Sequence, residues 1–192
     1  MKIKFILTII IASFSLSHIN AQSPFRAGAS FNVVFPSGDY TKIAYSGIGG
    51  SVVADYSLSP QWQLILSSSY SSLKSKIPQI GIDSKAIDFS INSIDFLFGG
   101  RYNFNYSFFV LAKSGISYIK LHANIYDSPS NSEDEVSSDY ESYFSASFGG
   151  GYRFNLAKDK SDFELAAIYN YTKGDIINFN RYLLKASLLL YL

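Results

Sequence analysis

Histidine is the side chain best suited to acid–base catalysis near neutral pH, and the chain has two, His18 and His122. We expect His18 to leave with an N-terminal targeting segment, so His122 is the remaining candidate. Asp127 and Ser128 follow it closely in the sequence. In a catalytic site both would have to lie near the histidine in space, Ser128 as the nucleophile and Asp127 as the acid that orients the histidine. The simpler interpretation is an exposed residue at the end of a strand. The sequence has no phosphate-binding glycine loop, nucleophile elbow or dinucleotide fingerprint, so we predict no catalytic residue and no enzyme.

A second candidate is an acidic stretch between residues 127 and 139. Its carboxylates could offer oxygen ligands to a divalent cation such as calcium, although their spacing matches no EF-hand loop. They are Asp127, Glu133, Asp134, Glu135 and Asp139. A solvated acidic loop explains the same residues, so we predict no metal site and no cofactor.

A third group is basic. Lys74, Lys76 and Lys85 lie close together in the sequence and could contact the phosphates of lipopolysaccharide. The alternative is that they are ordinary solvated lysines. The chain as a whole has 16 basic and 15 acidic residues, which gives no reason to expect a nucleic acid as a partner.

The elements that carry these residues are predicted to be β-strands, because apolar residues recur at every second position through most of the chain. Eight such segments of about ten residues can be recognised, which is the length of a tilted strand that crosses a bilayer. They cover residues 25–35, 48–57, 62–70, 87–102, 108–118, 143–154, 163–172 and 181–192. In the fourth segment the apolar residues change parity near Asn92 and Ser93, and we expect a β-bulge there.

The connections between the segments alternate in length. Short turns are expected at 58–61, 103–107 and 155–161, and longer links at 36–47, 71–86, 122–139 and 173–178. Short periplasmic turns opposite long external loops are typical of a transmembrane barrel. The predicted fold is therefore an all-β, eight-stranded, antiparallel, up-and-down transmembrane β-barrel.

Within the segments one set of residues is apolar and the other is polar. The apolar set is expected to face lipid, with its aromatic residues gathered in two girdles near the strand ends. A soluble barrel that turns its apolar side chains inward is disfavoured, because the polar set carries many charges. Those charges are expected to pair across a lumen filled by side chains. The inward candidates are Arg26, Asn32, Asp55, Gln63, Asp95, Lys113, Arg153, Glu164, Arg181 and Lys185.

The N-terminus has the pattern of a signal peptide. Lys2 and Lys4 precede an apolar run from residue 5 to residue 16, which is short for a membrane-spanning helix. We expect cleavage after Ala21, so that residues 1–21 are the signal peptide and residues 22–192 form one barrel domain. An uncleaved anchor is the alternative. The chain has no cysteine, which excludes disulfides and thiolate metal sites.

Four features together resemble the family of small outer-membrane β-barrel proteins, of the OmpX/OmpA or PorT-like type. They are the Asn20-Ala21-Gln22 end of the signal peptide, the loop at residues 36–40, the glycine-rich segment that ends Tyr56-Ser57-Leu58, and the amphipathic C-terminal strand. Three glycine pairs, at 49–50, 99–100 and 149–150, form a weak internal repeat, and we expect them to relieve crowding in a narrow barrel. The resemblance implies a location in the cell outer membrane and little about activity.

The function we predict is a structural role or a surface interaction through the external loops. The alternatives are a narrow channel or small-ligand transporter, and a barrel enzyme that acts on lipid. The expected partners are outer-membrane lipid and lipopolysaccharide, the barrel-assembly machinery during insertion, and an unidentified surface molecule at the loops. The protein is expected to be a monomer.

Overall fold

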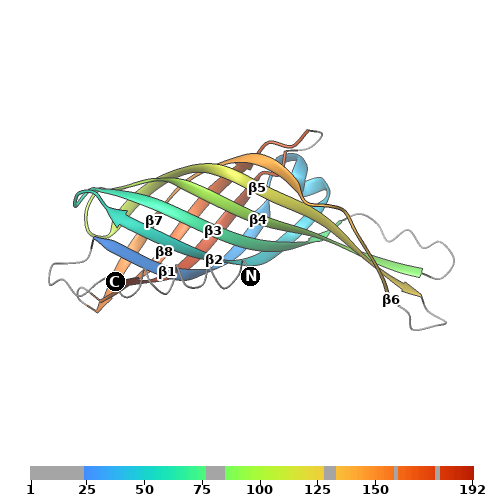
Figure 1. Ribbon diagram of the computed structural model, residues 1–192, viewed down its shortest axis with the longest axis horizontal. Coiled ribbons are helices and arrows are strands. Elements are labelled where there is room, and N and C mark those ends of the chain that lie inside the picture. The colour runs from blue at the N-terminus through green and yellow to red at the C-terminus, as the bar shows by residue number, and fades with distance from the viewer. Residues whose placement is uncertain (1–23, 77–84, 128–132, 158–159, 176–177) are drawn as a thin grey trace, which may run out of the picture.

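Nine strands and one short 3-10 helix make up the part of the chain that the computed structural model describes, which is residues 24–76, 85–127, 133–157, 160–175 and 178–192. The predicted signal peptide lies outside these residues. Figure 1 shows the arrangement of the elements. Their bounds are β1 Phe25–Pro36, η1 Gly38–Lys42, β2 Ala44–Ser57, β3 Trp62–Ser75, β4 Lys85–Asn103, β5 Phe108–Asp127, β6 Glu133–Ser137, β7 Glu141–Ala157, β8 Ser161–Thr172 and β9 Arg181–Tyr191.

Eight of the strands close into a barrel in which every neighbour pair is antiparallel. The order around the barrel is β1, β2, β3, β4, β5, β7, β8 and β9. The ring closes where β1 pairs with β9, from Arg26 opposite Tyr191 to Pro36 opposite Arg181. The predicted fold and its strand count are therefore confirmed. No helix among the described residues has the length and hydropathy to span a membrane.

The outer surface of the barrel is apolar, as predicted. Aromatic side chains gather at both ends of the strands and many of them touch their neighbours. At the end with the short turns, Trp62 packs against Tyr102 and Phe108 against Tyr152, with ring centroids 5.0 and 4.8 Å apart. Towards the other end, which we call the outer end, Tyr169 packs against Tyr182 at 5.1 Å. This distribution matches the two girdles that a membrane barrel needs at its interfaces.

The expected β-bulge near Asn92 and Ser93 is wrong. The β4 strand keeps one register with both β3 and β5 through this region. Ile91 and Ser93 both point inward and are buried, whereas Ile94 points outward. The apolar residues change parity because the lumen itself becomes apolar towards the outer end.

Two of the expected long loops contain strand instead. β3 and β4 extend into residues 71–86, and residues 122–139 hold the last part of β5 and the whole of β6. β6 pairs with β5 from Glu133 opposite Tyr126 to Ser137 opposite His122. At this end β4, β5 and β6 project well past the other strands, at the right of Figure 1. Apolar residues still alternate in the extended parts of β4 and β5, at Ile87 and Phe89 and at Leu121, Ala123 and Ile125, but with the parity opposite to that of the membrane-spanning residues. The predicted fifth segment therefore ended too early.

The first glycine of each repeated pair lies where a neighbouring strand approaches closely. A Cβ at Gly99 would lie 2.0 Å from the backbone oxygen of Ala112, and one at Gly49 would lie 2.3 Å from that of Tyr70. No side chain fits at these distances. The glycines allow strong coiling of the sheet, as the sequence predicts.

The orientation of β9 can be tested with two adjacent residues. Leu188 is 47% exposed on the outer surface, whereas Ser187 is 4% exposed and faces the lumen. Leu188→Arg is expected to lower the free energy of unfolding by roughly 2 kcal/mol, because it places a charge against lipid. Ser187→Asn keeps a hydrogen-bonding group in a polar lumen and is expected to cost less. A urea titration in lipid vesicles measures both, and equal costs would contradict the orientation.

Candidate functional site

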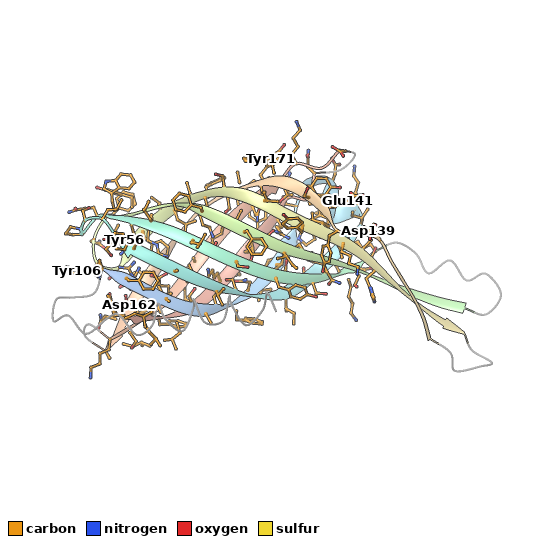
Figure 2. All side chains as sticks on the ribbon, viewed as in Figure 1. Tyr56, Tyr106, Asp139, Glu141, Asp162 and Tyr171 are labelled. Carbon is orange, nitrogen blue, oxygen red and sulfur yellow. The ribbon has the colours of Figure 1, made fainter. Side chains whose placement is uncertain are left out.

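The lumen near the short turns is filled by a network of buried charges, which we call the lumen network. Its members are Arg26, Asp55, Gln63, Arg101, Arg153, Asp162 and Glu164. Arg26 donates hydrogen bonds to Asp162 Oδ2 at 2.7 Å and to Asp55 Oδ2 at 2.8 Å. Figure 2 places Asp162 at this end of the barrel.

Glu164 is the second centre of the lumen network. Arg101 binds both of its carboxylate oxygens, at 2.7 and 2.9 Å, and Arg153 Nε donates to Oε1 at 2.9 Å. A two-pronged guanidinium–carboxylate contact of this kind fixes both partners in one geometry. The network therefore acts as a rigid crosslink between strands that are far apart in the sequence.

All eight barrel strands contribute to this level of the lumen. Six of them supply the members of the lumen network. The two remaining strands add aromatic groups: the Phe109 ring of β5 lies 4.2 Å from the Arg101 guanidinium carbon, and the Tyr191 hydroxyl of β9 donates to Asp162 at 2.8 Å. Side chains from every barrel strand therefore meet at this level of the lumen.

A separate ion pair lies further along the lumen. Arg181 Nη2 contacts Asp95 Oδ1 at 2.5 Å, and its Nη1 donates to Ser93 Oγ at 2.6 Å. Ser69 donates a further hydrogen bond to Asp95 Oδ2 at 2.8 Å. The Asp95 carboxylate is thus fully occupied by its neighbours.

The outer end of the lumen is closed by apolar side chains, which we call the apolar cap. It consists of Val34, Tyr40, Ile43, Leu73, Ile91, Ile119, Tyr143 and Phe179. Tyr40, from η1, is buried and packs edge-on against Phe179 at 5.4 Å. Residues 36–47, expected to be a long loop, instead form η1 and the start of β2, and this segment turns over the barrel end (Figure 1).

Two backbone hydrogen bonds hold the segment that carries η1 in this position. The Ser37 N–H donates to the Asn180 carbonyl at 2.8 Å, and the Lys76 N–H donates to the Ile43 carbonyl at 2.7 Å. On the exposed side of η1, a hydrogen bond to Asp39 raises the pKa of Lys42 above its usual value. The apolar cap is therefore attached to the residue that precedes β9 and to the residue that follows β3.

The ten predicted inward residues all face the lumen, and the predicted pairing of opposite charges is confirmed. The sequence analysis missed Arg101 and Asp162. Arg101 has the same parity as Asp95 in the fourth segment, so the alternation that placed Asp95 inward applied to Arg101 as well. Asp162 lies next to the predicted turn, just before the residue at which β8 was expected to begin. Applying the inward parity of Asp95 to Arg101 and that of Glu164 to Asp162 predicts that both side chains face the lumen.

The outer end holds the other candidates. His122 lies near the end of β5, opposite Ser90 of β4 and Ser137 of β6. Lys74 and Lys76 are exposed at this end, and Lys76 lies 5.0 Å from the centre of the Tyr45 ring. The Lys85 side chain, and those of Asp127 and the three acidic residues of β6, lie outside the described residues. Among the described side chains, no cluster of three His, Asp or Glu residues could hold a metal ion.

The extended part of β4, β5 and β6 forms what we call the external sheet, comprising residues 85–89, 122–127 and 133–137. β3 stops pairing with β4 at Lys74 opposite Ser90, so residues 85–89 have β5 as their neighbour. In the described part of the chain, β6 pairs with β5 alone. The external sheet thus has two strand edges, and backbone groups on such edges can pair with another chain.

Comparisons with known proteins agree with this architecture. The family model described as "outer membrane protein beta-barrel domain" matches residues 6–188. The structure is similar to Ail, the attachment invasion locus protein of Yersinia pestis, solved in complex with the heparin analogue sucrose octasulfate. That match has 19% identity and a TM-score of 0.50, and it covers 87% of this chain and 97% of that chain. The Neisserial surface protein A matches at 17% identity and a TM-score of 0.51, covering 88% of this chain and 98% of that one. No curated protein sequence matches the chain.

The lumen network can be tested by removing one carboxylate. Glu164→Gln leaves Arg101 and Arg153 without their shared partner in a buried position, and a loss of about 3–5 kcal/mol is expected. The measurement is the temperature at which the folded band disappears on an electrophoresis gel. The matched control is Asp39→Asn, which removes an exposed ion pair with Lys42 and should leave that temperature unchanged. Equal behaviour of the two variants would contradict the role given to the network.

Proposed function

This chain belongs to the outer membrane protein beta-barrel domain family and resides in the cell outer membrane, and we propose that it acts there as a closed barrel that contacts other molecules through its external sheet. The observation that carries the proposal is the combination of a lumen blocked at two levels with a sheet that rises past the outer rim. A blocked lumen argues against flow through the barrel, and the external sheet offers a binding surface.

The chemistry of the external sheet favours a polypeptide partner. A strand edge offers unpaired N–H and C=O groups, which an extended chain can match by adding a strand. The sequence of β6, Glu133-Asp134-Glu135-Val136-Ser137, is acidic. We therefore infer that the partner is an extended and basic segment of a protein. A sulfated sugar of the kind bound by Ail would be repelled by this acidic segment and is the competing ligand to test.

Binding by the external sheet predicts a clear difference between two peptides. Protein in lipid nanodiscs should bind an alternating Lys–Val peptide, and should bind an alternating Glu–Val peptide at least about tenfold more weakly. Calorimetric titration measures both, and sucrose octasulfate serves as a third ligand. Binding of sucrose octasulfate alone would overturn the assignment of a basic polypeptide.

A truncated variant provides the control. Removing residues 77–88 and 123–138 and inserting an Asn-Gly turn at each junction retains nearly all of the strand pairing that closes the barrel. This variant should still shift on boiling in an electrophoresis gel and should no longer bind the Lys–Val peptide. Retained binding would place the site elsewhere on the barrel.

The alternative of a narrow channel leads to a separate prediction. Because both the lumen network and the apolar cap cross the lumen, the protein is expected to give no discrete current steps in a planar lipid bilayer. Current steps with a reproducible size and ion selectivity would favour the channel instead.

We also infer that residues 1–21 are removed on export, and that the assembly machinery recognises β9, whose alternating outward leucines support this. Mass spectrometry of protein from the membrane fraction should give a mature chain that begins at Gln22. We propose no enzymatic role, since strand pairing sets His122 between Ser90 and Ser137 on the rim, away from the enclosed part of the lumen.

A further inference from the structure

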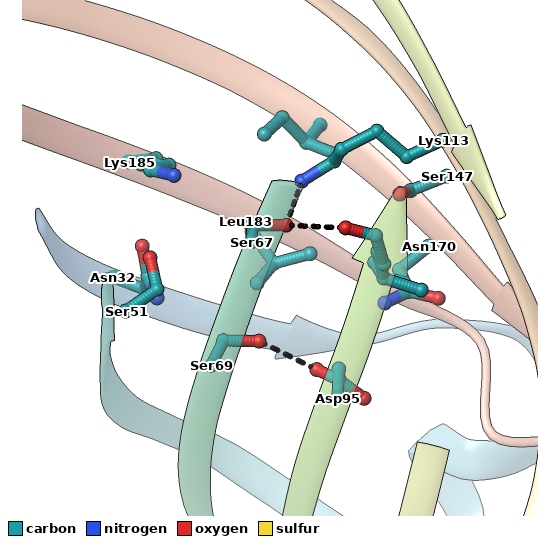
Figure 3. A pocket seen from close by; sticks show the side chains of 12 residues that line it. Asn32, Ser51, Ser67, Ser69, Asp95, Lys113, Ser147, Asn170, Leu183 and Lys185 are labelled. Atoms are coloured by element: carbon teal, nitrogen blue, oxygen red, sulfur yellow. Dashed lines mark hydrogen bonds between the residues drawn. The ribbon is translucent and has the colours of Figure 1, made fainter. Parts of the chain in front are cut away.

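Between the lumen network and the Arg181–Asp95 pair lies a small polar cavity of about 20 Å³. Roughly 10–15 Å³ is enough for one water-sized species. Figure 3 shows that Lys113 and Lys185 both reach this cavity. They come from β5 and β9, two barrel strands separated by β7 and β8. Two ammonium groups therefore share one enclosed space.

The charges of the lumen do not balance. Its described cations are Arg26, Arg101, Lys113, Arg153, Arg181 and Lys185, and its described carboxylates are Asp55, Asp95, Asp162 and Glu164. Six cations face four carboxylates, so two positive charges are left over. Each arginine forms an ion pair with a carboxylate, whereas neither lysine does so with any described carboxylate. Lys113 Nζ donates instead to the neutral Ser67 hydroxyl at 3.0 Å.

The walls of the cavity also hold unsatisfied polar atoms. Ser147 is 4% exposed, and its hydroxyl has no hydrogen-bond partner. Asn32 is 2% exposed, and its Oδ1 has no partner either. Buried polar atoms are normally satisfied, so these two indicate a bound species. Asp95 is the one acidic residue in the wall, and its carboxylate already contacts Arg181, Ser69 and Ser117.

We propose that this cavity binds a small inorganic anion of the halide class, held between the Lys113 and Lys185 ammonium groups. Ser147 lines the side of the cavity next to Lys113, and Asn32 lines the opposite side near Lys185 (Figure 3). The anion offsets the excess positive charge, which would otherwise be costly in an enclosed lumen. Larger anions such as sulfate exceed the cavity.

Diffraction with bromide tests the proposal directly. The full-length mature protein is refolded from urea in sodium bromide, so that access to the lumen does not limit binding, and is then crystallised. An anomalous peak between the nitrogen atoms of Lys113 and Lys185 is expected. A water molecule there, with no anomalous signal, would overturn the proposal, and so would bromide found only on the outer surface.

Stability in solution provides a second measurement. At constant ionic strength, replacing gluconate by bromide at ten times its dissociation constant should raise the folded-to-unfolded ratio about elevenfold. The double variant Lys113→Met and Lys185→Met should lose this difference. Lys173→Met, which changes an exposed lysine outside the lumen, should retain it. If the double variant retains the difference between bromide and gluconate, the proposed site is wrong. If the double variant does not fold, the anomalous bromide peak in the unmodified protein tests the proposal by itself.

Discussion

Inside a bilayer no water is available to a backbone amide, so each N–H and C=O of a membrane strand must find a partner strand. The pairing of β1 with β9 meets this requirement for the two strands that would otherwise be edges. Once the ring is closed, eight strands enclose a space that side chains must fill. The outward-facing residues then contact lipid and must be apolar, and the inward-facing residues must fill the lumen. The remaining features of the barrel follow from this one closure.

The lumen holds several buried ion pairs among apolar and neutral polar side chains. Buried ion pairs add little net stability, because removal of each charge from water offsets most of the attraction. Their geometry is nevertheless restrictive: Glu164 can satisfy Arg101 and Arg153 together in one register of β4, β7 and β8. A slip of one residue in any of these strands would turn a charge towards lipid. The lumen network therefore discriminates between registers more than it stabilises the correct one.

Alternation of apolar and polar residues was sufficient to predict the fold, the eight barrel strands and all ten inward residues, because lipid enforces the alternation. It gave wrong strand ends where the parity of the apolar residues reverses. Towards the outer end, Ile87 and Phe89 of β4 and Leu121, Ala123 and Ile125 of β5 alternate with the parity opposite to that of the membrane-spanning residues. It also failed at Ile91, because the apolar cap makes the lumen apolar and reverses the expected parity. The partners of each charge could not be predicted either, since they depend on stagger between strands that sequence spacing does not encode.

The two closures of the lumen differ in chemistry, yet temperature acts on both in the same direction. The apolar cap rests on Tyr40, Phe179 and the aliphatic residues beneath them, and hydrophobic contacts weaken on cooling. The lumen network rests on buried charges, and the cost of removing charges from water falls as temperature rises. Cooling therefore weakens both layers, and moderate warming strengthens both. The two chemistries thus cannot compensate for one another in the cold, where each is at its weakest.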